Sequence, residues 1–435
     1  MKQVVWVIIV VGVVVGAVVI GGGLGEAATT RATPMTFWTF GPGASTPFFE
    51  AAARAWNAAY PERPIALTCQ LYPYEDLHTR LLIALKTGQG APDLSDIEVN
   101  KFPNFVRKGD QIHLIPLNDL IELVQAKFVQ ARFAIYAKDG QYYGVDYHVG
   151  ATVMFYNQEI LAQAGVDVNK IETWADFVNV GKRVVAKTGK MMTTIETLDT
   201  WTQWPLISQR GSDFLDQDGN PTLDDAVNIS ALQFQYDLIY KERIAIVAPG
   251  GLHLGDQYWA FMKQGGAAAV MMPIWFMNCF VTSMPALKGK MLIRPLPRWE
   301  AGGFRSAGMG GTATVITDQC HDVALAKAFL AYAKLTQAAA INIWNQIGID
   351  PIRWDAWPLL KEQPPNKYTE YFGTEIFDIL MQVKDEIHPV HYGELSPKIK
   401  DLYRSKIVYH VLELKDQTPA EALHAAAAEL RRLQK

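Results

Sequence analysis

Short apolar segments alternate with amphipathic segments in the part of the chain that follows residue 34. The pattern predicts strands at 35–40 and 65–71, helices at 46–60 and 74–86, and a turn at 91–98 that leads into a third strand. Such alternation with short connections implies a parallel sheet with right-handed crossovers. Ligands bind beyond the carboxyl ends of the strands in these sheets. The sequence therefore predicts an α/β lobe whose loops face a cleft.

The rest of the chain continues this mixture of elements. Strands are predicted at 141–145 and 151–157, and a long helix at 324–346 that ends at Gly348. A closing helical segment is predicted from Ser396 onward. Three Thr-x-x-acid patterns resemble capping boxes and predict helix starts, at Thr173, Thr222 and Thr418. A chain of 435 residues with this pattern fits two large lobes better than one.

Charge and cysteine content narrow the function classes. The net charge is -4 and the pI is about 6.2, and no run rich in Lys or Arg is present. Nucleic acid is therefore not expected as a partner. Cys69, Cys279 and Cys320 lie far apart and form no CxxC pair, so neither a metal-ligand spacing nor a disulfide framework is indicated. At most one bridge is possible, and pairing of Cys279 with Cys320 stays open.

The N-terminus has the pattern of an export signal. Lys2 is followed by a charge-free apolar run over 4–20, and the small residues Gly25 and Ala27 predict cleavage after Ala27. No cysteine follows the run, so a lipid attachment site is absent. An uncleaved membrane anchor is the alternative, because the run is close to the lower length limit for spanning. Residues 1–27 are thus interpreted as signal or anchor, and 28–34 as a linker.

The common enzyme signatures are missing. The chain has no Gly-x-Ser-x-Gly elbow, no His-Glu-x-x-His and no Walker loop, and the glycines around Pro42 fit a strand-to-helix turn better than a dinucleotide loop. His388 and His391 fit a solvated loop better than a metal pair, because Pro389 lies between them. No cofactor and no metal are expected. A glycosidase-like pair of carboxylates, drawn from Glu98, Asp146 and Asp350, is the rival hypothesis.

Aromatic side chains are set where the cleft loops should lie. A sugar site needs flat aromatic faces for the ring CH groups together with polar side chains for the hydroxyl groups. Trp56 and Trp174 lie on predicted helix faces and are interpreted as core. Each of the others is as compatible with core packing as with a cleft: Trp38, Phe40, Tyr147, Trp201, Trp204, Trp275 and Trp344.

Several motifs together resemble the extracellular family 1 solute-binding proteins, whose relatives include the maltodextrin-binding protein of bacterial ABC importers. The resemblance covers nearly all of the chain after the signal. The motifs are 87–94 (TGQGAPDL) followed by Glu98, 143–146 (YGVD) with 150–157 (GATVMFYN), 164–167 (AGVD) with 173–177 (TWADF), 261–268 (FMKQGGAA) with 273–275 (PIW), and 308–312 (GMGGT). Their order and spacing, more than any single motif, carry the resemblance.

The resemblance implies a two-lobed periplasmic-binding-protein fold of class II, with discontinuous α/β lobes joined by a hinge. The implied lobes are 35–147 plus 312–357 and 148–311 plus 358–435. The candidate ligand-binding residues are the positions that match those of the family, together with Asp146, which lies beside Tyr147. They are Phe40, Glu98, Asn100, Lys101, Asp146, Tyr147, His148, Trp201, Trp204, Trp275, Gly310, Gly311 and Arg353.

The implied function is capture of a sugar, with a di- or oligosaccharide expected from the many aromatics, and its delivery to an ABC importer. The implied partners are the permease subunits in the cytoplasmic membrane, the implied location is the periplasm or the outer face of that membrane, and a monomer is expected. The alternatives are the same fold with a polyol phosphate or a polyamine as ligand, and an exported carbohydrate-active enzyme.

Overall fold

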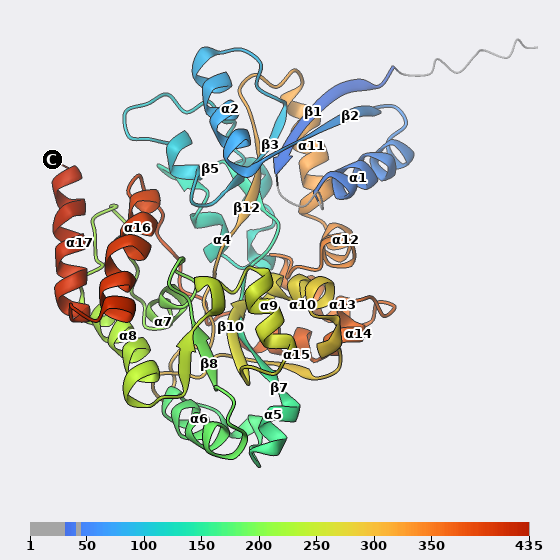
Figure 1. The fold of residues 1–435 in the computed structure, drawn as a ribbon. Helices are drawn as coiled ribbons and strands as arrows, with labels where there is room; N and C mark the ends of the chain where they lie inside the picture. The colour runs from blue at the N-terminus through green and yellow to red at the C-terminus, as the bar shows by residue number, and fades with distance from the viewer. Residues whose placement is uncertain (1–30, 41–44, 435) are drawn as a thin grey trace, which may run out of the picture.

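The computed structural model of the protein describes residues 31–40 and 45–434. The predicted signal or anchor and the turn around Pro42 lie outside these residues. The chain folds into two α/β lobes, one above the other in Figure 1, and passes between them more than once. This confirms the two-lobed architecture predicted from the sequence.

The first lobe is built on a five-stranded sheet. Its strands run in the order β2 (Ile65–Tyr72), β1 (Thr33–Phe40), β3 (Leu94–Glu98), β12 (Thr312–Ile316) and β6 (Gly144–Asp146). Strand β1 is parallel to β2 and β3, as predicted, whereas β12 is antiparallel to β3 and β6. The parallel strands β1 and β3 end at Phe40 and Glu98, so the loops after them leave the same edge of the sheet.

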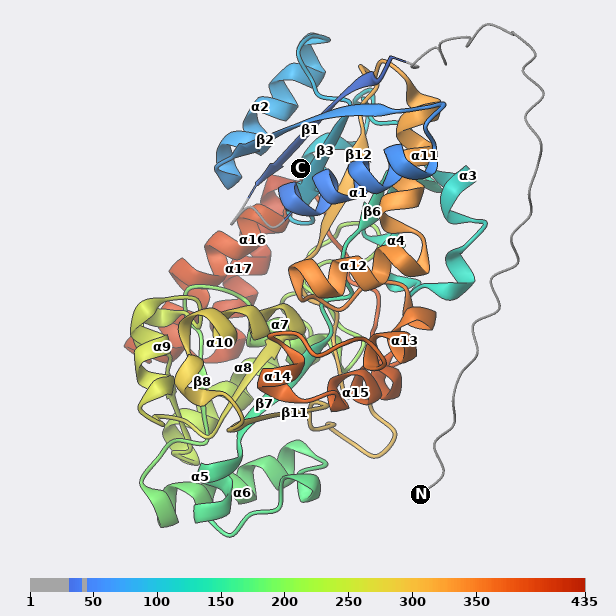
Figure 2. The ribbon, with the colours of Figure 1, turned by 90° about the vertical axis from the view of Figure 1, so that its right-hand side faces the viewer.

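Helices cover both faces of this sheet (Figures 1 and 2). The long ones are α1 (Ser45–Ala59), α2 (Tyr74–Thr87), α11 (Val323–Lys334) and α12 (Gln337–Ile347), and the short elements are α3 (Asn118–Ile121), α4 (Ala131–Ala134), β4 (Ala137–Lys138) and β5 (Gln141–Tyr142). Helix α1 packs against α11 and α12. Three phenylalanine rings form the contact between β1, α1 and α11. The ring centroid of Phe49 lies 4.3 Å from that of Phe37 and 6.0 Å from that of Phe329.

The long helix predicted at 324–346 is wrong in one respect, because the structure has two helices there. Helix α11 ends at Lys334, and Thr336 begins α12 by accepting a hydrogen bond from the backbone N–H of Ala339. A Thr hydroxyl competes well for helix N-terminal donors, so it starts a new helix rather than continuing the old one. Gly348 ends α12 in the left-handed conformation, as predicted.

The second lobe has a smaller, antiparallel sheet. Its strands are β10 (Ala269–Pro273), β7 (Thr152–Asn157) and β11 (Met291–Arg294), and β8 (Thr193–Ile195) pairs in parallel with β9 (Ala245–Val247). The surrounding helices are α5 (Gln158–Gln163), α6 (Trp174–Thr188), α7 (Gln203–Ser208), α8 (Ala226–Tyr236), α9 (Asp256–Lys263), α10 (Met277–Ser283), α13 (Trp357–Lys361), α14 (Thr369–Phe372), α15 (Glu375–Val383), α16 (Ser396–Leu402) and α17 (Pro419–Leu433).

The last two helices lie against the second lobe, since α17 packs on α8 and on α16 (Figure 1). Two of the three predicted capping boxes are confirmed, at Thr173 and Thr418. The third is wrong: Asp225, not Thr222, is the N-cap of α8, and it accepts a hydrogen bond from the N–H of Asn228. A carboxylate at the N-cap caps as well as a hydroxyl does, so Asp225, the acidic residue of the Thr222 pattern, takes the N-cap position itself.

Three segments connect the lobes side by side, the first around 146–151, the second around 308–312 and the third around 350–352. The backbone N–H of Tyr147 donates to the carbonyl of Thr312, at 3.2 Å, and that of Val149 donates to the carbonyl of Asp350, at 2.9 Å. Isolated bridges pair Ala151 with Gly308 in the same region. The predicted lobe boundaries at 147/148, 311/312 and 357/358 stay a prediction about which residues move together.

Candidate ligand-binding site

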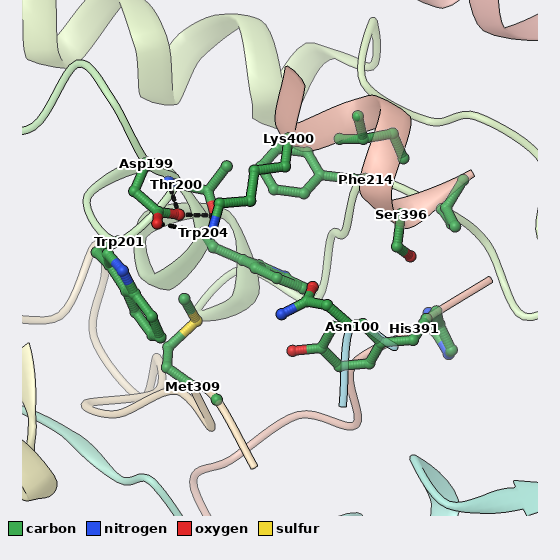
Figure 3. A pocket seen from close by; sticks show the side chains of 14 residues that line it. Asn100, Asp199, Thr200, Trp201, Trp204, Phe214, Met309, His391, Ser396 and Lys400 are labelled. Carbon is green, nitrogen blue, oxygen red and sulfur yellow. Dashed lines mark hydrogen bonds and ion pairs between the residues drawn. The ribbon is translucent and has the colours of Figure 1, made fainter. Parts of the chain in front are cut away.

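A pocket lies between the lobes and holds about 480 Å³ of empty space, part of which opens to solvent. Asn100 comes from the first lobe and Met309 from a connecting segment (Figure 3), and Gly310 follows Met309 in the pocket wall. The second lobe contributes the remaining wall: Asp199, Thr200, Trp201, Trp204, Phe214, Leu215, His391, Tyr392, Ser396, Ile399 and Lys400. A molecule held here would touch both lobes, so its binding would favour their closure.

Aromatic rings form one wall of the pocket. Trp201 is partly exposed and meets Trp275 edge to face, with ring centroids 5.2 Å apart. Trp204, one helical turn further into α7, is buried and packs on Phe214 and Tyr392 at 5.3 and 5.0 Å. Trp201 therefore offers an accessible ring held in place by its neighbours, which is the arrangement that suits stacking on an apolar sugar face.

An ion pair forms part of the polar wall. The ammonium of Lys400, on α16, lies 2.7 Å from a carboxylate oxygen of Asp199, which follows β8 (Figure 3). The other Asp199 oxygen accepts from the backbone N–H of Thr200, at 2.7 Å. The Asp199 side chain is 15% exposed and that of Lys400 44% exposed. The two charges compensate each other, and both groups keep hydrogen-bonding capacity toward the pocket.

The first lobe contributes a hydrogen-bonded cluster at the end of β3. The Glu98 carboxylate accepts from the hydroxyl of Tyr74 at 2.9 Å and from the backbone N–H and the side-chain amide of Asn100, at 2.9 and 2.8 Å. Burial raises the pKa of Glu98, although these donors act in the opposite direction. The cluster fixes the orientation of the side-chain amide of Asn100, a residue that lines the pocket.

Phe40 and Lys101 lie beside this cluster and outside the pocket wall. Phe40 packs on Tyr74 and His78, with ring centroids 5.2 and 5.0 Å apart. Lys101 pairs with Glu75 at 2.9 Å and lies over the Tyr74 ring at 5.2 Å. Both residues support the loop after β3, and a ligand role for either stays a prediction.

Glycine is required at the pocket floor for two different reasons. Gly310 has φ of 74°, and a Cβ there would lie 3.5 Å from the ring of Trp201. Gly311 has φ of 153°, and a Cβ there would lie 2.4 Å from a guanidinium nitrogen of Arg132. Gly310 therefore borders the pocket as predicted from the family motif, while Gly311 makes room for a buried side chain.

Tyr147 and Asp146 point into the protein. Tyr147 is 2% exposed, and its hydroxyl donates to the carboxylate of Asp96, at 3.0 Å. The ammonium of Lys334 lies 3.2 Å from the centroid of its ring. Asp146 is fully buried and accepts hydrogen bonds from Arg132. The structure places both residues behind the pocket, and their predicted contact with ligand has no support in this arrangement.

His148 and Arg353 are also engaged within the protein. His148 Nδ1 lies 3.8 Å from Asp350 Oδ1 in the connecting segments, and burial lowers the pKa of the imidazole to about 4. Arg353 donates to both carboxylate oxygens of Asp355, at 2.7 and 3.1 Å. A bidentate pair of this kind leaves little of the guanidinium for a ligand. Neither residue lines the pocket.

The structure also separates the tryptophans that the sequence left undecided. Trp344 is 1% exposed and packs on Tyr368 and Phe377, so it belongs to the core. Trp38 packs on Tyr72 at the sheet edge. Trp56 and Trp174 are buried, as predicted. All three cysteines, including Cys279 and Cys320, are unpaired.

The C-terminal segment supplies pocket residues that the sequence did not indicate. His391, Tyr392 and Lys400 line the wall, and Asp213 accepts a hydrogen bond from the backbone N–H of His391. The sequence around His391 predicted a solvated loop, and nothing local to it marks a ligand site. Asp199 could have been found, because it directly precedes Thr200-Trp201 in the loop that follows β8.

The family model for bacterial extracellular solute-binding proteins matches residues 42–340. An arabinooligosaccharide-binding protein of Halalkalibacterium halodurans is 50% identical over 395 residues, which are 91% of this chain and 88% of that protein. An arabinooligosaccharide-binding protein of Bacillus subtilis is 45% identical over 401 residues, 92% of each chain.

Solved structures share the fold at low identity. The GacH receptor of Streptomyces glaucescens matches with a TM-score of 0.73 at 19% identity, over 93% of this chain and 98% of that one. The sugar-binding protein MalE of Xanthomonas citri matches with a TM-score of 0.75 at 20% identity, over 91% and 96%. Motifs, lobes, cleft pocket and relatives agree, and the chain belongs to the bacterial extracellular solute-binding proteins.

Proposed function

We propose that this protein captures an arabinose-containing oligosaccharide between its lobes and delivers it to the permease of an ABC importer. The observation that carries the ligand class is the 50% identity to an arabinooligosaccharide-binding protein over most of both chains. The pocket supports a sugar, because it combines the accessible ring of Trp201 with the hydrogen-bonding groups of Asn100 and Asp199.

The charges of the pocket favour a neutral ligand. Lys400 is compensated by Asp199, and Glu98 is hydrogen bonded to Tyr74 and Asn100. A phosphate ligand would require uncompensated Arg or Lys in the pocket, and a polyamine would require uncompensated carboxylates. Both alternatives, a polyol phosphate and a polyamine, therefore rank below an oligosaccharide.

Binding without catalysis is part of the proposal. A glycosidase needs two carboxyl groups that flank the scissile bond. Of the three carboxylates considered for this role, Asp146 and Asp350 are fully buried and accept backbone N–H groups in the connecting segments. This leaves Glu98 without a partner from that set and supports a binding protein over an enzyme.

We further propose that the protein is exported and acts as a monomer in the periplasm or at the outer face of the cytoplasmic membrane. The described residues contain no helix that is long and apolar enough to cross a membrane. The apolar run at 4–20, outside those residues, has the sequence pattern of a signal or an anchor. Two lobes that enclose the ligand need no second copy to complete the site.

The test is a titration of the protein from Ala28 onward, followed by tryptophan fluorescence, with arabino-oligosaccharides from the disaccharide upward. Arabinose, maltose, lactose, a polyol phosphate and a polyamine serve as counter-ligands. We expect saturation with the arabino-oligosaccharides and no product by chromatography. A response to a counter-ligand alone would overturn the ligand class, and released monosaccharide would overturn binding without catalysis.

Two variants show whether the pocket is the site. Trp201→Ala removes the accessible ring, and we expect an affinity loss of about tenfold, since ring stacking contributes about 0.5–1.5 kcal/mol beyond the apolar area that it buries and tenfold corresponds to about 1.4 kcal/mol. Trp259→Phe is the matched control, because Trp259 lies in the same lobe and outside the pocket wall. Equal affinity of the two variants would place the ligand elsewhere.

A further inference from the structure

One buried arginine bonds to two of the segments that connect the lobes. Arg132 lies on α4 and is 1% exposed. Its Nε donates to Asp146 Oδ2 at 3.2 Å, and its Nη2 donates both to that oxygen and to the carbonyl of Gly310, at 2.6 Å for the latter. Asp146 stands at the start of the first connecting segment, and Gly310 lies in the second.

Asp146 extends these bonds to the backbone of both segments. Its Oδ1 accepts from the N–H of Tyr147 at 2.7 Å and from that of Thr312 at 3.2 Å. We call the group of Arg132, Asp146 and the Gly310 carbonyl the hinge clamp. A buried carboxylate that bonds to a guanidinium and to backbone N–H groups is held in one position, because each lost partner would leave a buried polar atom unsatisfied.

The segment around Arg132 also meets the third connecting segment. The backbone N–H of Val129 donates to the carbonyl of Ile352, at 3.0 Å. Residues 129–132 thus contact all three connections between the lobes. A side chain here can therefore influence how the lobes are held relative to each other.

The hinge clamp shares one residue with the ligand pocket. Gly310 gives its carbonyl to Arg132, lines the pocket, and lies against the ring of Trp201. Gly311 is adjacent, and a Cβ there would collide with Arg132 Nη2 and approach Asp146 Oδ2 to 2.9 Å. The two adjacent glycines of the GMGGT motif therefore have different roles. Gly310 borders the pocket, and Gly311 leaves room for the side chain of Arg132.

From these contacts we infer that Arg132 is a positioning residue for ligand binding, which holds the Met309–Gly310 floor of the pocket and ties it to the hinge. Arg132 does not line the pocket, and acts through the Gly310 peptide and Asp146. The inference deepens the proposed function and rests on it for the ligand used in the test.

The first arm of the test compares Arg132→Met with Lys334→Met. Lys334 is an equally buried basic residue of the same lobe, 1% exposed, which donates to the carbonyl of Val145 and, at 3.1 Å, to Thr314 Oγ1. None of these residues lines the pocket. Lys334 lies over the ring of Tyr147 but bonds to neither Gly310 nor Asp146. We expect both variants to lose stability. Only Arg132→Met should also weaken the binding of arabino-oligosaccharide, by about tenfold, because it removes a charge-assisted hydrogen bond to the pocket floor.

A milder variant covers the case in which Arg132→Met does not fold. Asp146→Asn keeps the size of the side chain and an acceptor for the backbone N–H groups, and removes the charge that holds Arg132. We expect an intermediate loss of affinity. Arg132→Lys should recover part of the affinity lost in Arg132→Met, because one ammonium can reach one of the two partners but has no guanidinium fork.

The second arm needs no ligand. Hydrogen exchange of the backbone N–H of Thr312, which donates to Asp146 Oδ1, should accelerate in Arg132→Met more than in Lys334→Met. Equal affinity losses in the two methionine variants, or wild-type affinity in Arg132→Met, would overturn the inference. If the wild-type protein binds no sugar at all, the proposed function fails, and the exchange arm still decides whether the hinge clamp holds the floor.

Discussion

At the residue scale, the pocket depends on charges whose partners come from distant parts of the chain. Asp199 follows β8, and Lys400 lies on α16 near the C-terminus. The pair keeps the pocket neutral while offering a carboxylate oxygen and ammonium protons to hydroxyl groups. A neutral, oriented set of donors and acceptors discriminates between sugars by geometry and not by charge.

Asp199→Asn tests this role. The change leaves the charge of Lys400 uncompensated and replaces an ionised acceptor with a neutral amide, so we expect the affinity for a neutral oligosaccharide to fall about tenfold. Titration calorimetry measures the effect. Lys406→Met is the control, because it removes an exposed ion pair with Glu429 outside the pocket. An unchanged affinity in Asp199→Asn would show that this carboxylate is not a ligand contact.

A buried carboxyl group behind the pocket predicts a pH dependence of stability. Burial raises the pKa of Glu196 from 4.5 to about 8. The folded state then keeps a proton that the unfolded state releases, so the free energy of unfolding falls as the pH rises from about 4.5 to about 8, by at most about 1.4 kcal/mol per pH unit. The stabilisation from the protonated Glu196 is therefore fully present below the unfolded-state pKa of 4.5, and it is lost as the pH rises through the folded-state pKa of about 8.

Glu196→Gln mimics the protonated form and should remove this dependence. We expect the variant to gain stability relative to the wild type between pH 6.5 and 8.5, whatever its absolute stability. Thermal unfolding of both proteins across this range gives the difference. The neighbouring His253, whose pKa burial lowers from 6.5 to about 3, changes stability mainly below about pH 6.5 and so adds little to the slope in this range. A constant difference over the range would contradict the raised pKa of Glu196.

At the element scale, the start of a helix is a local feature that the sequence predicts well. The Thr418 hydroxyl accepts from the N–H of Glu421 at 3.2 Å, and the Glu421 carboxylate accepts from the N–H of Thr418 at 2.8 Å. This capping box begins α17, which packs on α8 and so fastens the C-terminal segment to the second lobe. The pocket residues of α16 depend on that attachment.

Thr418→Ala removes the cap, and we expect the free energy of unfolding to fall by about 1 kcal/mol with little change in ligand affinity. Thr418→Ser retains the hydroxyl and should stay within a few tenths of a kcal/mol of the wild type. Chemical denaturation gives the stability, and hydrogen exchange locates the change in α17. Equal stability of the Ala and Ser variants would mean that tertiary packing alone holds this helix.

At the scale of the whole molecule, the three connecting segments form one hydrogen-bonded hinge beneath a pocket that both lobes line. Side-chain and backbone contacts also join the lobes away from the hinge, for example where the backbone N–H of Lys108 donates to Glu394, at 3.3 Å. A ligand that touches both lobes stabilises their closed arrangement by its differential affinity for it.

Ligand binding should therefore compact and stabilise the protein. We expect the radius of gyration from small-angle X-ray scattering to decrease with saturating arabino-oligosaccharide. Ligand at about 100 times its Kd should add about 2.7 kcal/mol to the free energy of unfolding. Stabilisation without a change in the radius of gyration would show binding to lobes that are already closed.

The sequence by itself determined the family, the parallel order of the first three strands, and the caps at Thr173 and Thr418. These features depend on neighbours a few residues away or on motifs with fixed spacing. It also indicated the aromatic residues near the cleft, of which Trp201 and Trp204 line the pocket and Trp275 supports it.

Only the tertiary structure decided which candidates face the pocket. Tyr147 and Trp344, like Trp201, are aromatic residues in the segments predicted to form the cleft loops. They lie in the interior, because burial depends on elements that are remote in sequence. Lys400 and His391 reach the pocket only because α17 and α16 return the C-terminal segment to the cleft. The hinge clamp likewise joins Arg132 to Gly310 across the fold, and no local pattern encodes such a contact.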